Sequence, residues 1–180
     1  MHQPLSNTDY TYQEVDIPEF RDVFYSLEGA IFVNEGTPNN YLYSPEEEEA
    51  LKGLRQNAES LMRLNIVIYH QGDPVGWMWG KQRDFETFHM VNSGLLPAHR
   101  NKGIYTKMLQ TLISKLSSLG FQIIQSKHRL HNSQVLIPKL KAGFFITGIN
   151  VDERFGTLAT LSYYTNDKRR EQFVNMMVGR

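Results

Sequence analysis

The segment from Leu95 to Thr106 concentrates residues suited to binding an anion. An apolar run that predicts a strand precedes it, and a predicted helix follows. The first turn of a helix presents unpaired main-chain N–H groups and the positive end of the helix dipole. Gly103 lets the main chain approach a ligand closely, while Arg100 and Lys102 add two cations. The segment therefore predicts a phosphate or pyrophosphate site.

Two common nucleotide-binding loops do not fit this segment. The P-loop needs Gly-Lys followed by Ser or Thr, and here the order is Lys102-Gly103-Ile104. The dinucleotide-binding loop needs three glycines at fixed spacing, and only Gly103 is present. A basic loop that merely starts a helix with glycine remains the structural alternative.

Composition narrows the possible partners. The chain of 180 residues suits one domain, residues 1–180. Lys and Arg together number 19, as do Asp and Glu, so the chain lacks the basic excess typical of proteins that bind nucleic acids or membrane surfaces. Without cysteine it has no disulfide, thiolate metal site or cysteine nucleophile. We expect no nucleic-acid partner, no membrane association and no metal.

We expect no secretion signal at the beginning of the chain. Met1-His2-Gln3-Pro4 lacks the basic and apolar regions of a signal peptide. No apolar run approaches the roughly 20 residues that span a bilayer. These features predict a cytoplasmic protein.

Periodicity predicts alternating strands and helices that would position the loop. Ser44-Pro45-Glu46-Glu47 predicts a helix start with a capping box, and Gly72-Asp73-Pro74 predicts a hairpin turn. The expected strands are Asp9–Val15, Asn65–Tyr69, Val75–Lys81, Thr87–Leu95, Phe121–Ser126, Phe144–Val151 and Leu158–Tyr164, and the expected helices are Pro18–Leu27, one from Ser44, Ile104–Leu119, Ser133–Ala142 and one after Asp167.

The order of these elements predicts a mixed sheet. Hairpin connections favour antiparallel pairing for most strands. The strand–helix–strand passage from Thr87 to Ser126 predicts one parallel pair with a right-handed crossover. Helices would then cover both faces of the sheet.

Two motifs resemble the GNAT N-acetyltransferase superfamily. Arg100-x-x-Gly103-x-Tyr105 resembles its pyrophosphate motif, Gln/Arg-x-x-Gly-x-Gly/Ala, with Tyr105 replacing the small last residue. The run from Asn132 to Gly143-Phe144 resembles a later family element, in which an asparagine and a short helix lead into a Gly-Phe strand start. The resemblance extends over most of Asn65–Tyr164.

The resemblance implies an α/β (α+β) fold, a single GNAT-like domain with a mixed, mostly antiparallel sheet. A central parallel strand pair would splay apart to admit acetyl-CoA, with helices on both faces. The main chain of Leu95 and Leu96 would pair with the pantetheine arm. The other implied cofactor-binding residues are Arg100, Asn101, Lys102, Gly103, Ile104, Tyr105 and Thr106 for the pyrophosphate, Asn132 for the arm, and Lys139 for a phosphate.

The implied activity is transfer of an acetyl group from acetyl-CoA to a primary amine of a small molecule or protein, by direct attack in a ternary complex. The alternative is a regulatory module that binds CoA or acyl-CoA with little or no turnover. The protein would be a monomer or a homodimer.

The catalytic groups are less directly indicated. His89 stands where some family members place a glutamate base, and strand alternation gives it the same face as Val91, Ser93 and Leu95. His128, at the end of its strand, is the candidate for protonating the thiolate. Lys139 replaces a tyrosine that many members carry.

Aromatic residues offer weaker candidates. Tyr41 and Tyr43 lie in the loop where the family often builds its acceptor site. Trp77 and Trp79, two residues apart on a strand, are expected to belong to the core.

Overall fold

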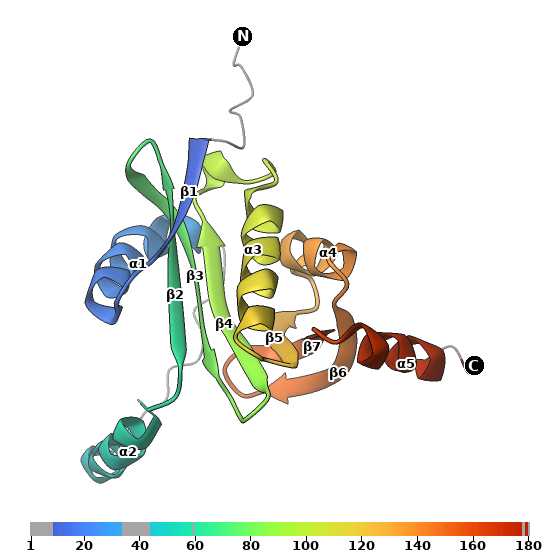
Figure 1. Ribbon diagram of the computed structural model, residues 1–180. Coiled ribbons are helices and arrows are strands. Elements are labelled where there is room, and N and C mark those ends of the chain that lie inside the picture. The colour runs from blue at the N-terminus through green and yellow to red at the C-terminus, as the bar shows by residue number, and fades with distance from the viewer. Residues whose placement is uncertain (1–8, 34–43, 59, 178, 180) are drawn as a thin grey trace.

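A computed structural model describes residues 9–33, 44–58, 60–177 and 179. Seven strands form one sheet in the order β1-β2-β3-β4-β5-β7-β6 (Figure 1). The strands are β1 (Tyr10–Glu14), β2 (Arg63–His70), β3 (Asp73–Gln82), β4 (Thr87–Leu95), β5 (Ile123–Arg129), β6 (Phe145–Asp152) and β7 (Gly156–Tyr164). The helices are α1 (Ile17–Ile31), α2 (Pro45–Ala58), the short 3-10 helix η2 (Pro97–His99), α3 (Ile104–Ser118), α4 (Ser133–Lys141) and α5 (Asp167–Met177).

The predicted mixed sheet is confirmed. Every neighbouring pair is antiparallel except β4 and β5, which are parallel and connected through α3. These two strands pair only from Thr87–Met90 to Ile123–Ser126, so their C-terminal halves separate. The point of separation, between Met90 and Ser126, is called the fork below. It confirms the splayed pair and opens next to the start of α3.

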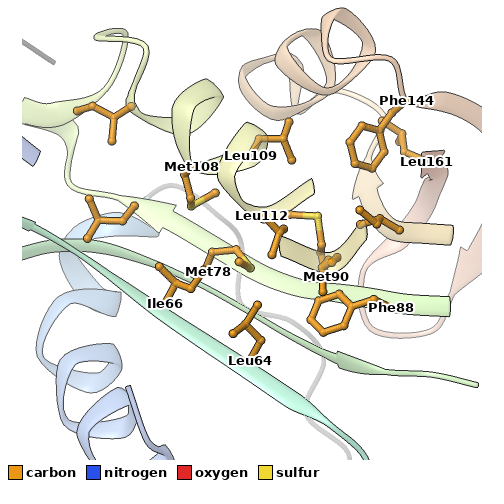
Figure 2. Close-up of a cluster of buried hydrophobic side chains, with 14 of the residues drawn as sticks. Leu64, Ile66, Met78, Phe88, Met90, Met108, Leu109, Leu112, Phe144 and Leu161 are labelled. Carbon is orange, nitrogen blue, oxygen red and sulfur yellow. The ribbon is translucent and has the colours of Figure 1, made fainter. Parts of the chain in front are cut away.

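Apolar side chains hold helices against both faces of the sheet. On one face, Phe88 and Met90 of β4 pack in a cluster with Met108, Leu109 and Leu112 of α3 (Figure 2). On the other face, Trp77 packs with Phe20 and Ile31 of α1. Trp77 is fully buried, as expected, and its Nε1 donates to Asn92 Oδ1 at 2.9 Å.

Local sequence signals predicted which elements form more accurately than they predicted the residues at which those elements begin and end. The capping box of α2 is confirmed: Glu47 N donates to Ser44 Oγ at 3.3 Å, and Ser44 N donates to Glu47 Oε2 at 2.7 Å. The turn predicted at Gly72-Asp73-Pro74 instead uses Gln71 and Gly72, with φ of 55° and 92°. Two successive residues with positive φ form the tight two-residue turn that suits the twist of a hairpin. Asp73 therefore belongs to β3 and not to the turn, and it pairs with His70.

A β-bulge at Val91 overturns one expectation. Gly80 pairs with Met90, whereas Trp79 pairs with Asn92, so the strand alternation shifts between them. Leu95 therefore packs with the α3 side, while His89 lies opposite Lys81 on the other face. The expectation that His89 shares a face with Ser93 and Leu95 was wrong, because an extra strand residue reverses the parity beyond it.

Candidate functional site

A cavity of about 500 Å³ lies where the separated ends of β4 and β5 meet the starts of α3 and α4. It begins at the end of α1 and runs along β4 to the loop before α3. The predicted cofactor residues that line it are Leu95, Arg100, Asn101, Gly103, Ile104, Tyr105, Thr106 and Asn132. The anion-binding segment and the later Asn132 element thus meet in one cavity, although Asn132 lies 29 positions after Gly103 in the sequence.

The start of α3 has the features of an anion-binding site. Gly103 precedes the helix with φ of 74°, a left-handed conformation that glycine adopts without strain. No side chain caps this helix, and its first internal bond is Lys107 N to Gly103 O at 3.0 Å. The preceding N–H groups therefore remain available to a pyrophosphate at this end of the cavity.

Arg100 has a structural role that its sequence context did not reveal. Its Nε donates to Leu95 O at 2.9 Å, and its Nη2 donates to Ile31 O at 2.7 Å. The side chain thus joins the end of α1 to the end of β4 while lining the cavity. A guanidinium that bridges two carbonyls braces the cavity wall.

Leu96, Lys102 and Lys139, three of the predicted cofactor residues, do not line the cavity. Leu96 N donates to Val75 O at 2.9 Å, so this N–H is hydrogen-bonded to β3 and is not available to the cofactor. The Lys139 side chain points to the fork, away from the predicted phosphate contact.

Several lining residues were not predicted. Ser93 and Gly94 extend the wall along β4, and a side chain at Gly94 would place its Cβ 2.7 Å from Ile31 Cγ2. His99 also lines the cavity, and its Nδ1 is 2.9 Å from the Tyr10 hydroxyl. Burial, then His70 and Lys102, lowers the pKa of His99. The sequence alone does not indicate these contacts, because each joins elements that lie far apart in the sequence.

Lys139 lies fully buried at the fork. It is 0% exposed, its Nζ donates to Ser126 Oγ at 2.6 Å, and it lies 3.2 Å from Met90 Sδ. His128 Nε2 is 3.0 Å from the same Ser126 oxygen. The ammonium, the hydroxyl and the imidazole therefore form a continuous polar chain where the two strands part.

Burial sets the protonation states of this polar chain. It lowers the pKa of Lys139 to about 7, so this amine exchanges protons near neutrality. Burial, followed by the charges of Lys139 and His89, lowers the pKa of His128 to about 3. His128 is therefore neutral at physiological pH, whereas Lys139 is the group whose proton is exchangeable there.

His89 is half-buried on the face opposite Ser126. Its Nδ1 is buried and has no hydrogen-bond partner among the described groups. Burial, then the charges of Arg83, Lys127, Lys139 and Lys81, lowers the pKa of His89 to about 4. A neutral imidazole thus lies on one side of the fork, and a buried amine lies on the other.

Other expectations concern absent features or undescribed residues. Tyr41 and Tyr43 lie outside the described residues. Within residues 9–33, 44–58, 60–177 and 179, no three His, Asp or Glu side chains gather to hold a metal ion. No helix in these ranges is long and apolar enough to cross a membrane.

Solved structures with a similar fold cover most of the chain. yncA of Salmonella typhimurium, solved with its cofactor acetyl-CoA, is 18% identical with a TM-score of 0.63, covering 88% of this chain and 95% of its own. The ribosomal-protein-S18-alanine N-acetyltransferase of Escherichia coli is 14% identical, with a TM-score of 0.62 and coverages of 87% and 94%. The spermidine/spermine N-acetyltransferase SpeG of Vibrio cholerae is 15% identical, with a TM-score of 0.62 and coverages of 92% and 98%. A search of curated proteins gave no match.

A family model gives the assignment. The model described as the acetyltransferase (GNAT) family matches residues 23–144, more than half of the chain. This span contains the splayed strands, the α3 loop and the cavity. The chain therefore belongs to the GNAT family of acetyltransferases, whose acetyl donor is acetyl-CoA.

Proposed function

We propose that the protein transfers an acetyl group from acetyl-CoA to a primary amine by direct attack in a ternary complex. The observation that carries this proposal is the fork, which has a neutral imidazole on one face and an exchangeable ammonium on the other. Such a pair can take a proton from an amine and give one to a thiolate.

The cavity suits the donor. The open start of α3 would hold the pyrophosphate, and the separated edge of β4 near Ser93 and Leu95 would pair with the pantetheine arm. Bound acetyl-CoA supplies the thioester carbon that the amine attacks and a sulfur that leaves as thiolate.

His89 is the proposed base. The attacking amine must lose a proton as its nitrogen bonds to carbon, and His89 is neutral above about pH 4. Its Nδ1 is buried and has no partner among the described groups, so the other ring nitrogen, Nε2, would take the proton. The amine would therefore approach from the side of the sheet on which His89 lies.

Lys139 is the proposed proton donor, in place of the phosphate contact expected from the sequence. As the carbon–sulfur bond breaks, a proton from the Lys139 ammonium would pass through the Ser126 hydroxyl to the thiolate. His128, neutral at physiological pH, would orient that hydroxyl through their 3.0 Å contact. Solvent would then reprotonate Lys139 and take the proton from His89.

Release of CoA thiol with a panel of amines tests the proposal. We expect turnover with at least one amine, and a mass increase of one acetyl group on that amine. Acetyl-CoA binding by calorimetry without turnover on any small amine, peptide or protein amine would contradict it and favour the regulatory-module alternative.

A further inference from the structure

Cations surround His89 on its face of the sheet. Lys81 pairs directly with His89 across β3 and β4, and Gln125 pairs with it across β4 and β5. Strand alternation places Lys127 on the same face as Gln125. The Arg83 guanidinium donates to the Gln125 side-chain oxygen. These five residues are called the His89 face.

The three cations of the His89 face lack anionic partners. Lys81, Arg83 and Lys127 are exposed, and across the described ranges none of them forms an ion pair. The polar partner of Arg83 is a neutral amide. Positive charge at this position is therefore not neutralised from within the face.

The nearby carboxylates form no ion pair with these cations, although the hydrogen bonds from Glu86 and Thr87, and then the Arg83 charge, help to lower the pKa of Asp84. Asp84 Oδ1 accepts hydrogen bonds from Glu86 N at 3.0 Å and from Thr87 N at 2.8 Å. Glu86 Oε2 pairs with Arg169 Nη1 at 2.8 Å. After the larger effect of burial, the charges of Arg83, Lys127, Lys139 and Lys81 also lower the pKa of His89.

This charge distribution selects among amines. Unpaired cations repel a ligand with several ammonium groups and attract one that carries an anion. They also favour the neutral form of a bound amine, because a like charge disfavours its ammonium. An anionic group on the same molecule would offset the repulsion during binding.

We propose that the acceptor is a small amine that also carries a carboxylate, as a free amino acid does, and that Lys81, Arg83 and Lys127 bind this carboxylate beside His89. The inference rests on the proposed acetyl transfer. It excludes a polyamine as the preferred acceptor.

Matched acceptors test the inference. Each of the common amino acids is compared with its carboxamide and with its decarboxylated amine by thiol release. We expect kcat/KM for the best carboxylate to exceed that of its amide by at least about tenfold, since hydrogen bonds between charged groups are about twice as strong as those between neutral groups. A preference for the amide, the decarboxylated amine or a polyamine would overturn the inference while leaving acetyl transfer intact.

Charge-removing variants connect that preference to the His89 face. Lys81→Gln and Lys127→Gln should raise KM for the carboxylate acceptor and shrink its advantage over the amide, with KM for acetyl-CoA unchanged. Lys168→Gln, on exposed α5, is the matched control and should behave as wild type. An unchanged carboxylate preference in both His89-face variants would overturn the inference. Absence of turnover with every amine would instead overturn the proposed function and this inference with it.

Discussion

Lys139 Nζ donates a 2.6 Å hydrogen bond to Ser126 Oγ in the interior of the protein. The Phe144 ring, centred 4.9 Å from Nζ, and Met90 Sδ, at 3.2 Å, also lie close to this amine. Among the described residues no carboxylate pairs with this amine. A buried ammonium without a counter-ion costs folding free energy, so its position reflects a demand other than stability.

Lys139→Met should therefore stabilise the protein. At pH 6 the folded wild type must hold a buried ammonium, and removing it should raise the free energy of unfolding by about 1–3 kcal/mol. Met fills a similar volume, and Ser126 keeps its contact with His128. Urea denaturation of both proteins measures the difference.

The same comparison has a defined pH dependence. The pKa of Lys139 is about 7 in the folded protein, against about 10.4 in an unfolded chain. Between these values the unfolded chain binds more protons, so wild-type stability rises with pH relative to Lys139→Met. The advantage of the variant should shrink from pH 6 to pH 9.5. A constant difference would show that Lys139 titrates normally.

The sequence was most informative where structure depends on neighbouring residues. The α3 start at Gly103 and the α2 capping box at Ser44 are local, and both are observed. The Arg100 bridge to Ile31 O spans 69 residues, and no local pattern encodes it. The bulge at Val91 inserts one residue into an otherwise regular strand, so alternation assigned His89 to the wrong face.

The burial of Lys139 could not be predicted either. Lysine in a short amphipathic helix is normally expected at the surface. Here the fork between β4 and β5 removes main-chain pairing below α4 and leaves room for the amine to reach Ser126. The unusual pKa follows from packing between elements and not from any residue adjacent in the chain.

Gly103→Glu should abolish acetyl-CoA binding. The new carboxylate would stand at the start of α3, where it repels the pyrophosphate and competes for the same N–H groups. We expect calorimetry to show an affinity for acetyl-CoA that is at least about 100-fold lower, which corresponds to about 2.7 kcal/mol of binding free energy.

Gly120→Glu is a matched control for that variant. Gly120 has φ of 92°, and no atom lies within 4 Å of the position that a Cβ would take there. The substitution therefore imposes a similar backbone strain at the far end of α3 without a steric clash. It should lower stability by about 1 kcal/mol and leave acetyl-CoA affinity unchanged. Equal affinities for the two variants would contradict the assignment of the pyrophosphate to the Gly103 loop.

Arg100→Ala should weaken both the fold and the cavity. It leaves the carbonyls of Leu95 and Ile31 without their shared donor, at an expected cost of about 1–3 kcal/mol in the free energy of unfolding. Acetyl-CoA affinity should also fall, because Leu95 and Ile31, which Arg100 holds together, both line the cavity. Arg55→Ala removes an exposed α2 ion pair with Glu48 and should cost less than about 1 kcal/mol. Equal costs would show that the brace contributes nothing.

The pH dependence of turnover separates the two proposed proton-transfer groups. His89 is an effective base only when neutral, so its contribution to kcat should persist from pH 8 down to about 4. Lys139 is an effective donor only when protonated, so its contribution should decline above about pH 7. The ratio of wild-type to variant kcat on one acceptor cancels the titration of the acceptor itself.

For His89→Gln this ratio should be at least about tenfold, within the range for general base catalysis, and flat between pH 5 and 8. For Lys139→Met it should be largest below pH 7 and approach one as the pH rises toward 9, because the wild-type amine then has no proton to give. Acetyl-CoA affinity should change little in either variant, since neither side chain lines the cavity. A Lys139→Met ratio that grows with pH would mean that the neutral amine is the active form, and the base would then be Lys139 and not His89.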